Sequence, residues 1–212
     1  LLENVSILEL GAFLGVVSKS FKNLAADIVA CDIPEFFNRD EVKSYYKRLN
    51  VPMQSFNLRE SVLPFASESK DCILLCETLE HLNFNPLPAL AEFNRILKKG
   101  GYLYVSMPDG SCFSKRLKFL FFGKSPGFTT NELFGALDPD ENMVVGLHWK
   151  EYSIKETIEM ITPLGFELVS SKSIYELSNS PTNVFRKLRR LIFPNDKTQV
   201  CIFKKTENYI RF

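Results

Sequence analysis

The hydrophobic and polar positions along the chain predict short buried strands that alternate with amphipathic helices. Apolar residues at positions 5, 7, 8 and 10 form a run of the length expected for a buried parallel strand. Gly11 and Gly15 interrupt this run, and apolar residues at 17, 21, 24 and 25 then recur at helical spacing. The full pattern predicts strands over residues 5–10, 27–32, 51–56, 71–76, 102–107, 165–170 and 199–203, and helices over 16–26, 39–49, 86–99, 153–164 and 183–193.

Some of these elements carry more detailed predictions. Residues 72–76 are apolar throughout, which predicts a strand at the centre of the sheet, whereas the last strand is expected at an edge. Two lysines followed by Gly100 and Gly101 are typical of a helix carboxyl end. Ser153, with Glu156 three residues later, predicts a capping box. The alternation as a whole predicts a doubly wound, Rossmann-like parallel α/β sheet with helices on both faces.

Polar side chains are expected together at the edge of the sheet where the parallel strands end. Glu9 and Gly11 end the first strand, Asp32 ends the second, and Asn57 and Glu77 follow the third and fourth. Ligands of doubly wound sheets bind outside the carboxyl ends of the strands. Asp32 follows Gly11 at about the 20-residue spacing of an acid that binds ribose hydroxyls, although an aspartate here could simply cap the next turn. The pattern favours a nucleoside ligand at this edge.

The alternation breaks at residues 109–149, which we expect to form a lid or substrate-binding insertion within a single domain of residues 1–212. The insertion contains a basic-aromatic stretch at 115–122, and a second such stretch follows at 185–193. Stretches of this kind suit peripheral contact with a membrane surface, or binding of an anionic acceptor such as a phosphorylated or lipid-linked sugar. The simpler alternative, which we favour, is a lid of phenylalanines and a solvated helix.

Composition narrows the classes of protein to consider. A net charge of +1 gives no reason to expect a nucleic acid partner, and no apolar run approaches the ~18 residues that span a bilayer. Five cysteines, an odd number, predict buried free thiols in a reducing, cytoplasmic compartment. Cys72 and Cys76 lie four residues apart, but the chain has no second cysteine pair of this kind, and His81 and His148 are its only histidines. We therefore expect no bound metal. The numbering begins at Leu1 rather than a methionine, so we expect that an amino-terminal piece is missing and make no prediction about targeting.

An ordered series of short motifs runs along the chain. In order, they are Glu9-x-Gly11-x-x-x-Gly15, Asp32, Leu63-Pro-Phe65, Leu79-Glu-His81, Arg95-Ile-Leu-Lys-Lys-Gly-Gly101 and Gly165-Phe166. Together they resemble the class I S-adenosylmethionine-dependent methyltransferases of the small-molecule type, closely from Val5 to about Met107 and more loosely to Phe203. This resemblance implies a seven-stranded, mostly parallel sheet with an antiparallel last strand.

The resemblance also assigns the strand ends to parts of the cofactor S-adenosylmethionine and its product S-adenosylhomocysteine. The glycine loop would hold the methionine part, and Asp32 would bind the ribose hydroxyls with Ile33 against the adenine. Asn57 falls where the family commonly has an acid for the adenine amine, and Cys76 and Glu77 would lie near the amino acid end or the substrate. The implied cofactor-binding residues are Glu9, Gly11, Ala12, Phe13, Gly15, Asp32, Ile33, Asn57, Leu58, Cys76 and Glu77.

Two positions depart from the family pattern. Phe13 stands where the family usually has a third glycine, so its side chain must point away from the cofactor or narrow the site. Asn57 stands where the family usually has a carboxylate, although an amide can still hydrogen-bond an adenine edge. These departures leave open a degenerate member of the family with a structural or regulatory role.

The expected chemistry asks for positioning and, for a hydroxyl acceptor, a base. A sulfonium methyl group is already electrophilic, so catalysis rests on aligning the acceptor with it and excluding water. We expect His148 first and His81 second as the general base; the alternatives are a surface histidine at 148 and a loop-positioning histidine at 81. The predicted function is O-methylation of a small metabolite or a sugar or glycan unit. A nicotinamide-dependent oxidoreductase is disfavoured, because the loop lacks G-x-G-x-x-G spacing.

Overall fold

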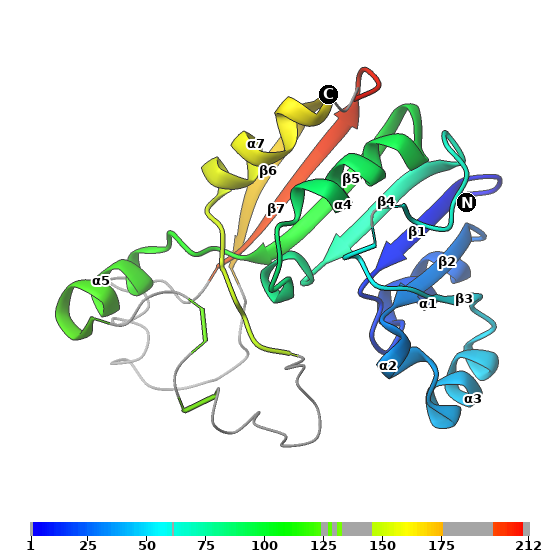
Figure 1. Ribbon diagram of the computed structural model, residues 1–212, viewed down its shortest axis with the longest axis horizontal. Coiled ribbons are helices and arrows are strands. Elements are labelled where there is room, and N and C mark those ends of the chain that lie inside the picture. The colour runs from blue at the N-terminus through cyan, green and yellow to red at the C-terminus, as the bar shows by residue number, and fades with distance from the viewer. Residues whose placement is uncertain are drawn as a thin grey trace.

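The computed structural model describes residues 2–60, 62–123, 127–128, 131–132, 146–175 and 197–209, with one seven-stranded sheet at its centre (Figure 1). The strand order is β3-β2-β1-β4-β5-β7-β6, and neighbouring strands are parallel except where β7 pairs with β5 and β6. This order confirms the predicted sheet class, its antiparallel last strand and the central position of β4. The strands are β1 (Ser6–Leu10), β2 (Asp27–Asp32), β3 (Met53–Ser55), β4 (Lys70–Cys76), β5 (Leu97–Pro108), β6 (Phe166–Tyr175) and β7 (Lys197–Lys205).

Helices cover both faces of the sheet because successive strand residues point to opposite sides. Leu8 of β1 belongs to a core cluster with residues of α4 (Leu87–Ile96) and α7 (Ile154–Ile161), which lie on the same face in Figure 1. Ile7, one position earlier, packs on the other face with residues of α1 (Val16–Asn23). The remaining described helices are α2 (Pro34–Phe37), α3 (Asp40–Leu49), η1 (Leu79–His81), α5 (Phe113–Phe122) and η2 (Thr162–Leu164).

The last strand does not lie at an edge, and that prediction was wrong. β7 pairs with β5 on one side and with β6 on the other, so β6 is the edge strand. Cys201 and Phe203 of β7 are fully buried, as expected for a strand with neighbours on both sides. The last strand in the chain need not be the last in the sheet, because the β6–β7 hairpin folds back so that β7 lies beside β5.

The helix predicted to end in the Lys-Lys-Gly-Gly sequence ends earlier. α4 stops at Ile96, and Leu97 already has the extended backbone of β5, with φ −70° and ψ 137°. Lys98 therefore lies in β5, where its Nζ is 2.8 Å from Oδ1 of Asp71. The positive charge near the helix end is paired with an acid on β4, which a reading of the helix alone could not show.

Arg95 connects two of the sequence motifs. Its guanidinium donates hydrogen bonds to the carbonyl oxygens of Leu63 (3.1 Å) and Phe65 (2.9 Å) and pairs with Glu92 (2.7 Å). Glu92 in turn accepts a hydrogen bond from the backbone N–H of Leu63 at 2.9 Å. α4 thus holds the Leu63-Pro-Phe65 segment in place beside the sheet.

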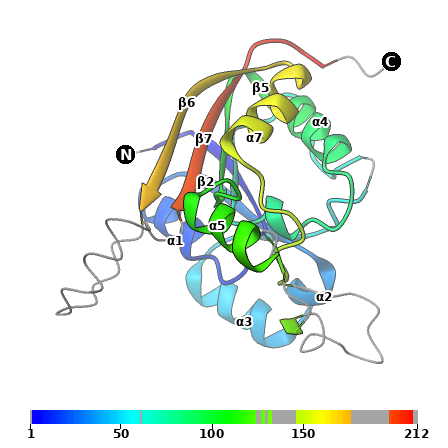
Figure 2. The same cartoon turned by 90° about the vertical axis from the view of Figure 1, so that its left-hand side faces the viewer.

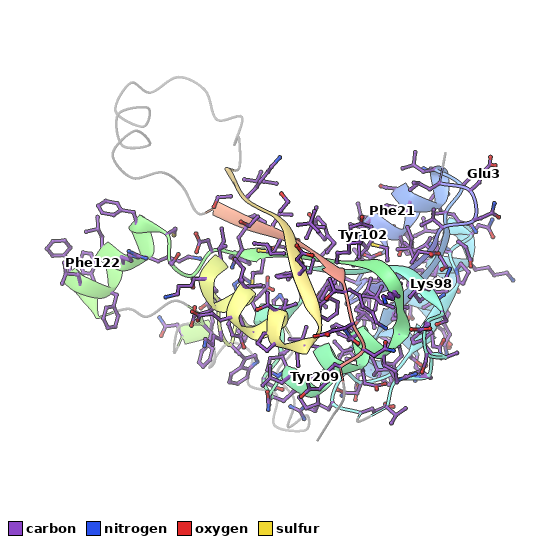
Figure 3. All side chains as sticks on the ribbon, turned by 90° about the horizontal axis from the view of Figure 1, so that it is seen from above. Glu3, Phe21, Lys98, Tyr102, Phe122 and Tyr209 are labelled. Atoms are coloured by element: carbon purple, nitrogen blue, oxygen red, sulfur yellow. The ribbon has the colours of Figure 1, made fainter. Side chains whose placement is uncertain are left out.

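The predicted insertion begins with α5, which projects from the sheet (Figures 1 and 2). Its last residues are exposed, and Phe122 lies at the far tip of the helix in Figure 3. Ser153 caps α7 with the predicted capping box to Glu156. The helix predicted at 183–193 lies outside the described residues. Among the described helices, none has the length and apolar character needed to cross a membrane.

Candidate functional site

A cavity of about 940 Å³ lies at the carboxyl ends of the parallel strands. Its wall comes from the loop after β1, the end of β2, the segment after β3 and the segment after β4. Most of the residues predicted to bind a cofactor line this cavity. They are Glu9, Gly11, Ala12, Phe13, Asp32, Ile33, Asn57, Leu58, Cys76 and Glu77.

The loop after β1 can form only because two of its positions are glycines. Gly11 has φ +70° and Gly15 has φ +66°, a conformation that side chains with a Cβ rarely adopt. A Cβ on Gly11 would overlap the side chain of Thr78, and a Cβ on Gly15 would lie 2.8 Å from the hydroxyl oxygen of Tyr46. Gly15 does not line the cavity itself; it allows the chain to turn into α1.

Tyr46 of α3 supports this loop from below, a role that sequence reasoning missed. The side chain is fully buried, and its hydroxyl donates a hydrogen bond to the carbonyl oxygen of Phe13 at 2.9 Å. Its ring also fills the space next to Gly15. The sequence predicted a helix over residues 39–49, but it did not indicate that Tyr46 donates a hydrogen bond to a loop 33 positions away.

Replacing Tyr46 with phenylalanine is expected to loosen the loop without breaking the core. The carbonyl oxygen of Phe13 would lose a buried partner, which costs about 1–2 kcal/mol of stability. We expect affinity for S-adenosylhomocysteine to fall about three- to tenfold, measured by calorimetry. Tyr45→Phe, on the neighbouring residue of the same helix, serves as control, and equal effects of the two variants would contradict this role of Tyr46.

Asp32, at the end of β2, lines the cavity and binds two backbone N–H groups. Its Oδ2 accepts the backbone N–H of Phe13 at 2.8 Å and its Oδ1 accepts the N–H of Ile33 at 2.8 Å. Burial raises the pKa of Asp32, and these two hydrogen bonds act in the opposite direction. Asp32 therefore fastens the glycine loop to the end of β2, and each oxygen keeps lone-pair capacity for a further donor.

Phe13 lies at the wall of the cavity. Its backbone has φ +44°, and its ring stacks on Phe36 of α2 with centroids 5.1 Å apart and an interplanar angle of 23°. The side chain is 61% exposed, so it leans on α2 and does not fill the interior. The loop keeps its left-handed turn here without the third glycine.

The segment after β3 places Asn57 and Leu58 at the cavity. The side-chain oxygen of Asn57 accepts the N–H of Arg59 at 3.0 Å, and its backbone N–H donates to Glu60 at 3.1 Å. Since the oxygen closes this turn, the amide –NH₂ is the group that Asn57 can offer to a ligand. A donor suits a ring nitrogen of adenine, whereas the carboxylate common in the family suits the adenine amine.

The ends of β1 and β4 complete the cavity floor. Glu9 is buried, accepts a hydrogen bond from the hydroxyl of Ser18, and has a pKa raised by burial. Burial likewise raises the pKa of Cys76 to about 12, so the thiol is not a nucleophile at neutral pH. Glu77 has φ +48°, and its N–H donates to the carbonyl oxygen of Ser106 at 2.8 Å.

The two histidines lie next to each other at one end of the cavity. His81 of η1 lines the cavity, and its ring centroid is 4.8 Å from that of His148, at an interplanar angle of 77°. His81 Nδ1 is 3.0 Å from the carbonyl oxygen of Leu147, and His148 Nδ1 is 3.0 Å from Oε1 of Glu151. Burial lowers the pKa of His81. The structure thus brings together the two residues predicted as base candidates, although His148 is not part of the cavity wall.

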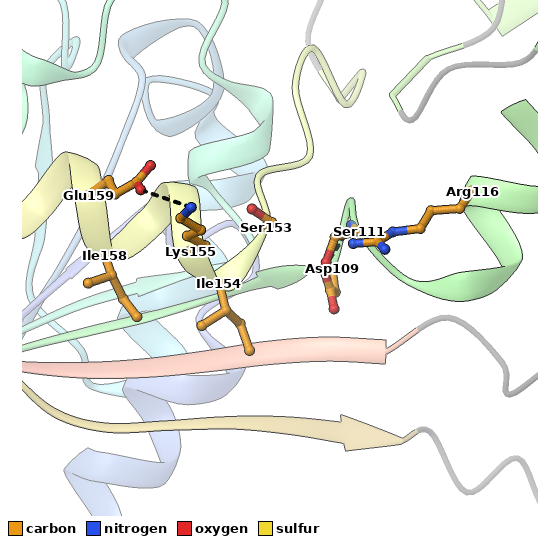
Figure 4. A pocket seen from close by; sticks show the side chains of 8 residues that line it. All are labelled: Asp109, Ser111, Arg116, Ser153, Ile154, Lys155, Ile158 and Glu159. Atoms are coloured by element: carbon orange, nitrogen blue, oxygen red, sulfur yellow. Dashed lines mark hydrogen bonds and ion pairs between the residues drawn. The ribbon is translucent and has the colours of Figure 1, made fainter.

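A second, open depression of about 630 Å³ lies between the start of α5 and α7 (Figure 4). Lys155 and Glu159 form an ion pair of 3.6 Å at its rim, and Asp109 accepts hydrogen bonds from Ser111. It contains none of the predicted site residues. The candidate site is therefore the larger cavity.

Comparisons with known proteins agree with this arrangement. Residues 8–105 match the family model described as a methyltransferase domain. The match bears out the resemblance to methyltransferases, in agreement with the sheet order, and covers the segment from β1 to β5 that builds the cavity. No curated protein matches the sequence.

Solved structures share the fold at low sequence identity. A chain from the complex of the Haloferax volcanii Trm112 methyltransferase activator with its provisionally assigned methyltransferase has a TM-score of 0.69 and 16% identity, over 97% of this chain and 84% of that one. A Methanosarcina mazei S-adenosylmethionine-dependent methyltransferase has a TM-score of 0.67 and 17% identity, over 97% and 94%. A Thermotoga maritima protein, also described as an S-adenosylmethionine-dependent methyltransferase, has a TM-score of 0.62 and 18% identity, over 98% of this chain and 84% of that one. At these identities the likeness establishes the fold.

Proposed function

We propose that this chain transfers a methyl group from S-adenosylmethionine to a hydroxyl oxygen of a small metabolite or of a sugar or glycan unit. The premise is the methyltransferase domain at residues 8–105 and its class I sheet. The observation that supports the proposal most is that the glycine loop, Asp32, Glu77 and His81 all line one cavity. Such a cavity combines a site for a nucleoside with imidazole at the end where an acceptor could enter.

Residues at the strand ends would hold the cofactor. Asp32, already oriented by two backbone hydrogen bonds, would accept from the ribose hydroxyls. Ile33 and Leu58 would pack against the adenine, and the amide of Asn57 would donate to a ring nitrogen. The glycine loop and Glu77 would bind the methionine part. The binding energy comes from a preformed pocket, because the loop is held by Asp32 and by the buried tyrosine of α3.

The transfer itself is a displacement at carbon. The acceptor oxygen forms a bond to the methyl carbon while the bond from that carbon to sulfur breaks, and sulfur keeps the electron pair as a neutral thioether. The hydroxyl proton must leave the acceptor, and in this proposal His81, which lines the cavity beside His148, accepts it. A pKa lowered by burial keeps His81 neutral and able to accept a proton at neutral pH. Buried apolar wall residues such as Leu10 and Phe56 exclude water.

Acceptor choice is proposed to reside in the insertion at 109–149. Its end returns to the cavity, since Gly146 lines the wall and the carbonyl oxygen of Leu147 holds His81. Helix α5, which lies at the beginning of the insertion, exposes several phenylalanines. A lid of this kind fits a single domain whose donor site and acceptor site come from different segments.

Calorimetric titration of the purified chain with S-adenosylhomocysteine tests this function. We expect one binding site of micromolar affinity and a rise in melting temperature, because a ligand that binds only the native state stabilises it. NADH at the same concentration should not bind. Binding of NADH alone would favour an oxidoreductase, and no binding of either ligand would favour a degenerate fold. Transfer of labelled methyl from S-adenosylmethionine to hydroxylated acceptors would then identify the substrate.

A further inference from the structure

Three side chains with metal-binding atoms meet beside the cavity. Glu80 and His81 lie in η1, directly after β4, and His148 comes from the segment before α7. One potential ligand atom of each lies within 4.8 Å of the others. The segments are brought together by backbone hydrogen bonds, since the carbonyl oxygen of Glu80 accepts the N–H groups of Trp149 (2.7 Å) and Lys150 (3.3 Å).

In both histidines Nδ1 is hydrogen-bonded, which leaves Nε2 as the atom that can bind a metal. His81 Nδ1 lies against the carbonyl oxygen of Leu147, and His148 Nδ1 lies against a carboxylate oxygen of Glu151. Both partners can only accept, so each neutral ring carries its proton on Nδ1 and has its lone pair on Nε2. Histidines that bind metals are oriented in this way, by a carbonyl or carboxylate on the other ring nitrogen. Glu151 is itself held by Lys115 at 2.5 Å.

Glu80 supplies the second, independent observation. Its side chain is fully buried, and apart from contact with its own backbone N–H neither carboxylate oxygen has a hydrogen-bond partner among the described residues. A buried carboxyl group whose oxygens find no hydrogen-bond partner is costly, and a bound cation would remove that cost.

We propose that Glu80, His81 and His148 bind a divalent transition-metal ion or zinc, through one carboxylate oxygen and two Nε2 atoms. Two imidazoles with one carboxylate suit zinc, manganese, iron or cobalt, whereas magnesium and calcium prefer oxygen ligands alone. With metal–nitrogen bonds of ~2.0–2.1 Å the ligand atoms must approach to roughly 3–3.5 Å of one another, a change within the reach of side-chain rotation. Three protein ligands leave coordination positions open.

The open positions would face the acceptor, an interpretation that rests on the proposed function. A hydroxyl bound to a divalent cation loses its proton to solvent more readily, and the cation fixes the oxygen that attacks the methyl carbon. The two histidines would then act on the acceptor through the metal, and not as free bases. This departs from the expectation of no metal, which weighed cysteine and histidine spacing and did not count Glu80.

Metal titration in the absence of cofactor tests the site. The chelator-treated full chain is titrated with zinc and manganese by calorimetry, and with cobalt by visible absorption, while magnesium serves as the oxygen-preferring comparison. We expect one zinc per chain at micromolar affinity or tighter, with much weaker magnesium binding. His148→Ala and Glu80→Gln should each weaken zinc binding at least tenfold, and Glu159→Gln, an exposed acid on α7, should leave it unchanged.

Glu80→Gln also separates a ligand from a structural residue. Glu80→Gln should abolish the rise in melting temperature that zinc produces in the parent chain, whereas Glu159→Gln should keep it. A zinc-induced rise, or zinc binding, equal to that of the parent would overturn the proposal. Binding of S-adenosylhomocysteine without any metal binding would remove the metal site and leave methyl transfer in place. Metal binding without S-adenosylhomocysteine binding would leave the metal site in place and contradict the proposed methyl transfer.

Discussion

Replacing Asp32 with alanine is expected to weaken S-adenosylhomocysteine binding at least about 100-fold. The substitution removes the proposed acceptor for both ribose hydroxyls, and hydrogen bonds to a charged group contribute about 1.5–3 kcal/mol each. It also releases the N–H groups of Phe13 and Ile33, so the glycine loop loses its attachment to β2. Calorimetry measures the affinity, and circular dichroism verifies that the sheet is intact.

Two further variants show whether the carboxylate acts as described. Asp32→Asn retains one oxygen but cannot accept from Phe13 at the other position, so we expect an intermediate loss of affinity. Asp27→Asn, at the exposed opposite end of the same strand, should bind like the parent chain. Because burial raises the pKa of Asp32, acidification should weaken binding at a pH above the ordinary value of 3.8. Unchanged affinity in Asp32→Ala would place the nucleoside elsewhere.

Replacing Gly11 with alanine is expected to disable the loop and to destabilise the fold by about 3 kcal/mol. A left-handed backbone costs a residue with a Cβ about 1–2 kcal/mol, and here the Cβ would also lie 2.6 Å from Cγ2 of Thr78. The loop must shift, so we expect loss of detectable S-adenosylhomocysteine binding. Chemical denaturation gives the change in the free energy of unfolding.

Gly123 provides a matched control for the cost of placing a residue with a Cβ in a left-handed backbone conformation. It has φ +63°, but a Cβ there would meet no atom of the described residues within 4 Å, so Gly123→Ala should cost only about 1 kcal/mol and leave binding unchanged. The overlap itself is measured by a double-mutant cycle with Thr78→Ala, in which the Gly11 substitution should cost less once the threonine side chain is removed. Equal costs in both backgrounds would show that Thr78 does not constrain the loop.

The sheet could be predicted from sequence because its signals are local. Apolar runs such as 72–76 have the length and composition of strands buried on both faces, and the motifs after them fix which ends carry polar groups. The position of β7 could not be obtained this way, since hairpin pairing between β6 and β7 depends on contacts distant in sequence. The end of α4 was misplaced for the same reason, because Lys98 pairs with Asp71 of another strand.

In the candidate site too, the residues with local sequence signals could be predicted, and those that depend on distant contacts could not. Asp32 and the glycines follow directly from their positions after strands, and the structure places Asp32 and Gly11 at the cavity. Tyr46 was not singled out because nothing near it in sequence distinguishes it from a core residue, and Glu80 was given no role although it lies within the Leu79-Glu-His81 motif. Their significance arises from distant partners: Tyr46 meets the loop of Phe13, and Glu80 is covered by the segment that carries Trp149.

The insertion is closed at its base by the chain itself. The N–H of Gly110 donates to the carbonyl oxygen of Tyr152 at 3.1 Å, and Trp149 is fastened to Glu80. The entropic cost of closing a loop grows only with the logarithm of its length, so changes in the number of residues between these anchors cost the sheet little stability. Insertions and deletions there would therefore alter one side of the proposed site and leave the strand ends that carry Gly11 and Asp32 unchanged.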